Sequence, residues 1–126
     1  MIYSRFYLIS SKKSEEVENG LHKITLGCEN RADAHGFIWI DTGKIIQQIQ
    51  LLFGEVVLEW FPNTGVICSK TNRALEVPKG IGFHKGVRIL HPVKNKATFE
   101  LALEEAKNAE YPSEWKEQIL EKFLLN

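Results

Sequence analysis

The chain has 126 residues, of which 44% are hydrophobic and 25% charged, and its sixteen basic and sixteen acidic side chains cancel. This length and composition predict one globular domain over residues 1–126 with its own hydrophobic core, and exclude a disordered or fibrous protein. A neutral chain has no overall electrostatic attraction to nucleic acid or to a membrane.

The first quarter of the chain predicts strands. Residues 2–9 (IYSRFYLI) are rich in aromatic and β-branched side chains, which favours a strand. The polar residues 10–20 leave two interpretations open: a short helix capped by Ser14, or a hairpin in which Asn19-Gly20 turns the chain into a strand over residues 21–26. We favour the hairpin.

After a loop over residues 27–36, a further strand is predicted for residues 36–41 (GFIWID). A helix is then predicted in the middle of the chain, with Asp41 or Thr42 as its N-cap and Gly54 as its C-terminal stop. Five apolar side chains have the spacing of one helix face: Ile45, Ile46, Ile49, Leu52 and Phe53.

A hairpin is predicted at the centre of the chain, where two apolar runs, residues 56–61 and 66–68, flank Pro62-Asn63-Thr64-Gly65. Alternate residues of its first run point to opposite sides of the sheet, and both sides are mostly apolar. We therefore expect this strand to lie in the middle of a sheet that is covered on each face.

The last third predicts a strand and two helices. Residues 87–91 (VRILH) favour a strand, Thr98 is typical of a helix N-cap, and Pro112-Ser113 ends one helix and starts another. Apolar side chains recur at helical spacing in both: Phe99, Ala102, Leu103 and Ala106, then Trp115, Ile119, Leu120 and Phe123. The predicted fold is α+β, with a mainly antiparallel sheet of five to six strands, one mid-chain helix and two C-terminal helices.

No motif predicts catalysis or cofactor binding. The glycines of residues 80–86 (GIGFHKG) precede a strand, whereas a phosphate-binding loop needs them before a helix N-terminus. The four histidines lack the spacing of metal ligands, and the two cysteines lie forty residues apart, which favours free thiols. We therefore predict a protein without metal, cofactor or enzymatic activity.

A basic segment offers an alternative function. Residues 70–96 hold seven basic side chains and one acidic one, with Phe83 among the lysines. Cations bind phosphates and aromatic rings stack on bases, so this segment could form a nucleic-acid or nucleotide-binding module. No apolar run is long enough to span a membrane, and the first residues do not have the pattern of a signal peptide, which predicts a cytoplasmic protein.

The C-terminal half resembles a known family. Its order of strands, glycine-bearing loop, alanine-lined helix, proline and tryptophan reads EVVLEWFPNTGVICSK, GIGFHKG, VRILHPV and ATFELALEEAKNAEYPSEWKE. It resembles an immunity-protein family of bacterial polymorphic toxin and contact-dependent growth inhibition systems, with Pro112, Trp115, Ala102 and Ala106 at matching positions. The match covers residues 55–117 and lacks the Arg-Pro that the family has before its tryptophan.

The resemblance implies an α+β protein that binds a cognate toxin domain in the cytoplasm and blocks it without catalysis. For a nuclease or another toxin that acts on nucleic acid, the toxin's active site is basic, so its inhibitor should present acidic side chains. Two candidate surfaces follow, a loop and an acidic C-terminal region. Their candidate partner-binding residues are Phe83 and His84 in the loop, and Glu104, Glu105, Glu110, Glu114 and Glu117 in the C-terminal region.

Overall fold

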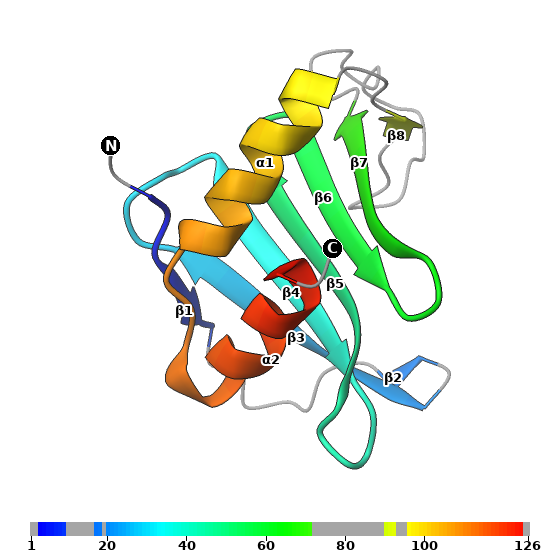
Figure 1. Cartoon of the computed structure of the whole chain (residues 1–126). Helices are drawn as coiled ribbons and strands as arrows, with labels where there is room; N and C mark the ends of the chain where they lie inside the picture. Colours follow the sequence, from blue (N-terminus) through cyan, green and yellow to red (C-terminus); the bar gives the residue numbers. More distant parts are fainter. Residues whose placement is uncertain (1–2, 10–16, 19, 72–89, 93–95, 125–126) are drawn as a thin grey trace, which may run out of the picture.

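The structure, a computed structural model, describes residues 3–9, 17–18, 20–71, 90–92 and 96–124. These residues form one antiparallel sheet with two helices packed on one of its faces (Figure 1). The predicted α+β class and the mainly antiparallel sheet are therefore confirmed.

The sheet has five long strands and three short ones among the described residues. The long strands are β3 (Leu21–Cys28), β4 (Ala34–Ile40), β5 (Ile46–Phe53), β6 (Val56–Phe61) and β7 (Gly65–Thr71). The short strands are β1 (Phe6–Leu8), β2 (Val17–Glu18) and β8 (Leu90–Pro92). The strand order is β1-β3-β4-β5-β6-β7-β8, and β2 also pairs with β3.

Two predicted hairpins are confirmed by strand pairing. Glu18 of β2 pairs with Leu21 of β3, and Gly20, which lies between them, has a φ of 78°. Glycine adopts this left-handed conformation without a steric penalty. The central hairpin is formed by β6 and β7, and β6 lies between β5 and β7 as predicted. Ser14, the N-cap of the alternative short helix, lies outside the described residues.

The predicted mid-chain helix is wrong, because its residues form strand β5 in the interior of the sheet. β5 pairs along its whole length with β4 and along its second half with β6. Three residues in succession, Leu51, Leu52 and Phe53, are buried, which requires cover on both faces of the strand. Tertiary pairing has therefore overridden the local helical pattern.

A β-bulge explains part of the helical spacing in this strand. Trp39 pairs with Gln48 whereas Ile40 pairs with Ile46, so Gln47 is an extra residue on β5. Ile46 therefore shares its face of the sheet with the residue three positions further on, rather than two. The same spacing of three is typical of one face of a helix.

The predicted N-cap closes a turn between strands. The Oδ1 atom of Asp41 accepts hydrogen bonds from the backbone N–H groups of Gly43 at 2.8 Å and Ile45 at 3.0 Å. Its Oδ2 atom accepts one from Nε2 of Gln47 at 3.0 Å. These bonds, chiefly the one from Ile45, hold the pKa of Asp41 below its usual value. Asp41 thus caps backbone donors as a helix N-cap does, but at the β4–β5 turn.

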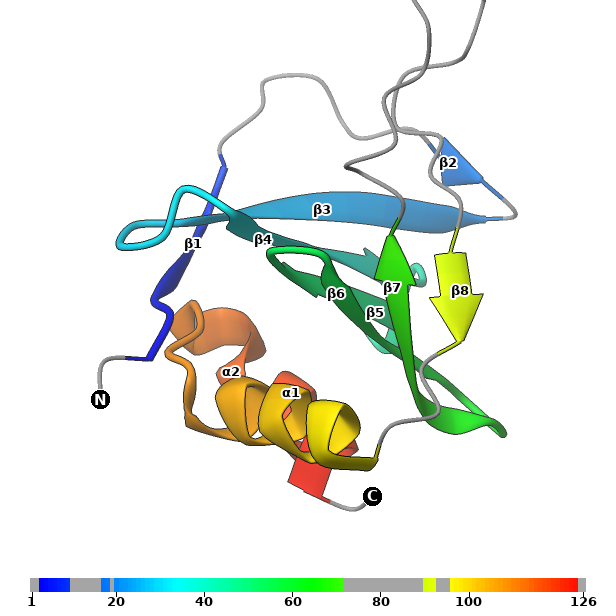
Figure 2. The same ribbon diagram turned by 90° about the horizontal axis from the view of Figure 1, so that it is seen from above.

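The core lies between the sheet and helices α1 (Lys96–Asn108) and α2 (Ser113–Leu124). The sheet curves around the helices, with β1 on one side and β7 and β8 on the other (Figure 2). α2 begins at Ser113 as predicted, and α1 begins two residues before Thr98. The predicted apolar stripes of both helices face the core. Six of their residues are buried: Ala102, Leu103, Ala106, Trp115, Ile119 and Phe123.

Candidate functional site

We call residues 96–124, which contain both helices, the helical layer; it lies on one face of the sheet (Figure 1). All five predicted acidic residues belong to this layer. Their positions are Glu104 and Glu105 on α1, Glu110 between the helices, and Glu114 and Glu117 on α2. The other two candidates, Phe83 and His84, lie outside the described residues.

The helical layer is acidic, and most of its charged side chains are exposed. It contains seven glutamates and four lysines, a surplus of three negative charges. Glu114, Glu117 and Glu121 recur at intervals of three and four residues, so they share one face of α2, and all three are exposed. The layer also exposes two large apolar side chains, Leu101 at 65% and Leu124 at 60%.

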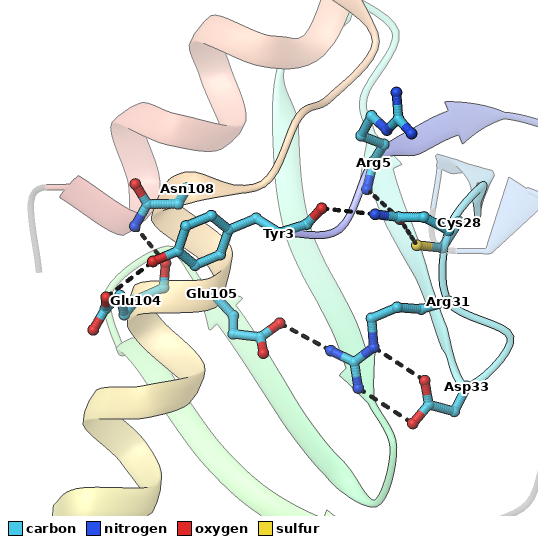
Figure 3. Close-up of polar contacts among 9 residues, drawn as sticks. Tyr3, Arg5, Cys28, Arg31, Asp33, Glu104, Glu105 and Asn108 are labelled. Atoms are coloured by element: carbon cyan, nitrogen blue, oxygen red, sulfur yellow. Dashed lines mark hydrogen bonds and ion pairs between the residues drawn. The ribbon is translucent and has the colours of Figure 1, made fainter. Parts of the chain in front are cut away.

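Glu104 and Glu105 both make contacts within the molecule. The hydroxyl of Tyr3 donates to Oε2 of Glu104 at 3.1 Å, and this bond raises the pKa of Tyr3 (Figure 3). Oε2 of Glu105 accepts a hydrogen bond from Nη1 of Arg31 at 3.0 Å. These two carboxylates therefore join α1 to the N-terminal segment and to the loop between β3 and β4.

Arg31 carries two ion pairs. Besides its contact with Glu105, its Nε and Nη2 atoms donate to the two carboxylate oxygens of Asp33 at 3.1 and 3.2 Å. The bond to Asp33 is the largest contribution that raises the pKa of the guanidinium. Its carbon Cζ lies 5.8 Å from the ring centre of Phe53, within the range of a cation–π contact. The guanidinium is thus fixed between two carboxylates and one aromatic ring.

The N-terminal segment is fixed to the same loop through Asn30. Its Nδ2 atom donates to the carbonyl of Tyr3 at 2.9 Å, and its Oδ1 atom accepts from the N–H of Arg5 at 3.0 Å. The thiol of Cys28 donates to the same Oδ1 at 3.2 Å. One amide side chain therefore orders residues 3–5, which positions Tyr3 against α1.

A hollow of about 190 Å³ opens where α1 passes over β5 and β6. Four apolar side chains and one ion pair line most of it: Phe53, Val56, Leu101 and Ala102, with Arg31 and Glu105. The hollow can therefore accept one long side chain of a partner.

Sequence reasoning missed Arg31 and Leu101. Leu101 could have been found, because it lies among polar residues on the exposed face of α1. Arg31 could not, because its partner Glu105 lies 74 positions away in the chain and only the fold brings them together.

The part of the chain that the structure describes holds no group of three or more histidine, cysteine or acidic side chains that could bind a metal ion. Cys28 and Cys68, both described, are free thiols. Neither α1 nor α2 is long and apolar enough to cross a membrane.

A comparison of the chain with models of protein families, with curated proteins and with solved structures finds no match.

Proposed function

We propose that this protein is an inhibitor that binds a bacterial toxin domain through its helical layer, in the cytoplasm of the cell that makes it. The observation that carries the proposal is the exposed acidic surface of the two helices, with Leu101 and Leu124 exposed among its glutamates. Interfaces between proteins combine a few apolar anchors with a polar rim, and this surface offers both.

The charge of the surface indicates the kind of toxin. A protein that cuts or modifies nucleic acid needs a basic active site, because phosphates are negative. A surplus of three negative charges on the helical layer complements such a site and would speed the encounter of the two proteins. The resemblance of residues 55–117 to immunity proteins supports the same function.

The first experiment is co-purification of the tagged protein with the product of the adjacent upstream gene, whose toxic domain has been inactivated. We expect a one-to-one complex that survives high salt, because apolar anchors do not depend on screening. Absence of a complex would contradict the proposal.

Charge reversal tests whether the helical layer forms the contact. Glu114→Lys with Glu117→Lys should slow association with the toxin domain, most clearly at low salt. Glu29→Lys with Glu55→Lys makes the same charge change at two exposed carboxylates in turns outside the helices, and should have a smaller effect. Equal effects of the two double variants would show that only net charge matters.

A second candidate function is binding of single-stranded nucleic acid on the opposite face of the sheet. There, Nζ of Lys23 lies 4.3 Å from the ring centre of Phe37 and 5.6 Å from that of Trp39. Phe37 and Trp39 are partly exposed, and aromatic rings beside a cation on a sheet face can stack on bases and contact phosphates. Of the basic segment proposed from the sequence, Lys70 is exposed at the end of β7.

Titration of a fluorescently labelled single-stranded oligonucleotide with the protein, followed by the anisotropy of the label, distinguishes this candidate from the first. Salt-dependent binding that is lost in Trp39→Ala would support it, and loss in Lys85→Glu with Arg88→Glu would add the basic segment. Anisotropy that the protein leaves unchanged would contradict it.

A further inference from the structure

The hollow beside α1 combines an apolar wall with a charged edge. Phe53 and Val56 come from β5 and β6, and Leu101 and Ala102 come from α1. Leu101 is 65% exposed, whereas Phe53 and Ala102 are buried, so the wall opens to solvent mainly at Leu101. A partner side chain that covers Leu101 would remove its apolar surface from water, which is favourable.

The edge of the hollow carries more negative than positive charge. Arg31 contributes one positive charge and is in contact with the carboxylates of both Asp33 and Glu105. The carboxylate side chains of Asp33 and Glu105 are 53% and 33% exposed. Two carboxylates therefore share one guanidinium beside the hollow, and the resulting net charge of −1 would attract a second cation.

We infer that this hollow is the anchor site for a lysine or arginine side chain of the protein partner. Such side chains have a long apolar stem and a charged head, and they bury the stem while the head stays at a polar edge. The stem would lie against Leu101, Ala102 and Phe53, and the head would bond to a carboxylate at the edge. The inference rests on the proposed function, since a basic toxin surface supplies such side chains.

A titration of the isotope-labelled whole protein with small probes tests the chemistry of the hollow without the partner. N-acetyl-lysine amide should shift the amide resonances of Leu101, Ala102 and Glu105 in a saturable way. N-acetyl-norleucine amide has a comparable apolar stem without the charge, and N-acetyl-glutamate amide has the opposite charge. Equal or larger shifts with either of these two probes, or no saturable shift with lysine, would overturn the inference.

Two variants test the hollow in the complex. Leu101→Arg puts a bulky cation at the hollow and should weaken the toxin complex by more than about tenfold, as expected for an anchor site. Leu124→Arg makes the same change at another exposed leucine of the helical layer, which does not line this hollow, and should weaken it less. Thermal unfolding of both variants checks that the fold is retained.

The outcomes separate this inference from the proposed function. If the wild-type complex forms and Leu101→Arg binds as tightly as the wild type, the protein is an inhibitor but its anchor lies elsewhere. If the wild-type protein captures no toxin, the proposed function fails, and the probe titration alone then decides whether the hollow binds a basic side chain.

Discussion

Arg31 and Glu105 lie 74 positions apart in the chain, and their side chains meet with Nη1 and Oε2 separated by 3.0 Å. This ion pair joins the loop between β3 and β4 to helix α1, at the edge of the hollow that we assign to a partner's side chain. The contact therefore has two roles to test, one in stability and one in shaping the surface.

The ion pair should contribute little to stability. The two side chains are 30% and 33% exposed, so water screens their attraction, and such pairs are worth about 0.2–1 kcal/mol. We expect Glu105→Gln to lower the free energy of unfolding by less than about 1 kcal/mol, and by less again at high salt. Urea unfolding at two salt concentrations measures this. Glu117→Gln, on an exposed position of α2, is the control, and a loss of several kcal/mol in Glu105→Gln would contradict the expectation.

The hydroxyl of Tyr111 should matter more, because it is buried. It donates to the carbonyl of Ala106 in the last turn of α1 at 2.6 Å, and the Tyr111 ring stacks on Phe6 with centres 5.5 Å apart. Tyr111→Phe keeps the ring but leaves this carbonyl without its donor, which should cost about 1–2 kcal/mol. Chemical unfolding monitored by circular dichroism measures the loss. A variant as stable as the wild type would mean that water replaces the hydroxyl.

The buried hydroxyl of Tyr111 also leads us to expect that the protein loses stability in alkali. Burial raises the pKa of its hydroxyl above the ordinary value of 10.0. A group with a raised folded-state pKa stabilises the fold fully below its unfolded pKa, and this contribution falls as the pH rises through 10. The wild type should therefore lose stability above about pH 10, and Tyr111→Phe should lose less over the same range. Parallel pH dependences of the two proteins would refute this assignment.

Phe123 and Leu124 form a matched pair at the end of α2. Phe123 is fully buried and Leu124 is 60% exposed. Phe123→Ala leaves a cavity in the core and should cost about 3–5 kcal/mol. Leu124→Ala should change stability by less than about 0.5 kcal/mol. Thermal unfolding compares the two variants, and similar losses would mean that α2 is packed differently.

The lowered pKa of Asp41 predicts that the protein loses stability in acid. Its folded-state pKa is lowered, so its hydrogen bonds stabilise the fold above the ordinary value of 3.8, and the contribution is lost as the pH falls below it. Asp41→Asn keeps an acceptor oxygen but not the charge, so it should flatten the dependence of stability on pH between about 5 and 2. Asp41→Ala removes the acceptor and should lower the unfolding midpoint at neutral pH as well. An unchanged acid profile in Asp41→Asn would contradict this account.

Local patterns were sufficient to predict the central hairpin and the two C-terminal helices. In the hairpin, turn residues separate two runs of strand formers, and in the helices the apolar residues recur at helical spacing and become the buried stripe. The same type of pattern failed for β5 for two reasons. The extra residue Gln47 gives Ile46 and Ile49 a helix-like spacing, and both faces of the strand are buried at Leu52 and Phe53. A strand's hydrogen-bond partners lie on other strands, so its local sequence does not contain them.

The acidic character of the C-terminal region was determined by the sequence alone, since charge depends only on composition. Which of its glutamates face solvent and which contact the body of the protein was decided by the tertiary structure. Glu114 and Glu117 remain exposed on α2, whereas Glu105 meets Arg31 beside a hollow formed by β5, β6, α1 and the loop between β3 and β4. Contacts between residues 74 positions apart arise only when strands and helices pack, because the chain must bring distant segments together to bury its apolar surface.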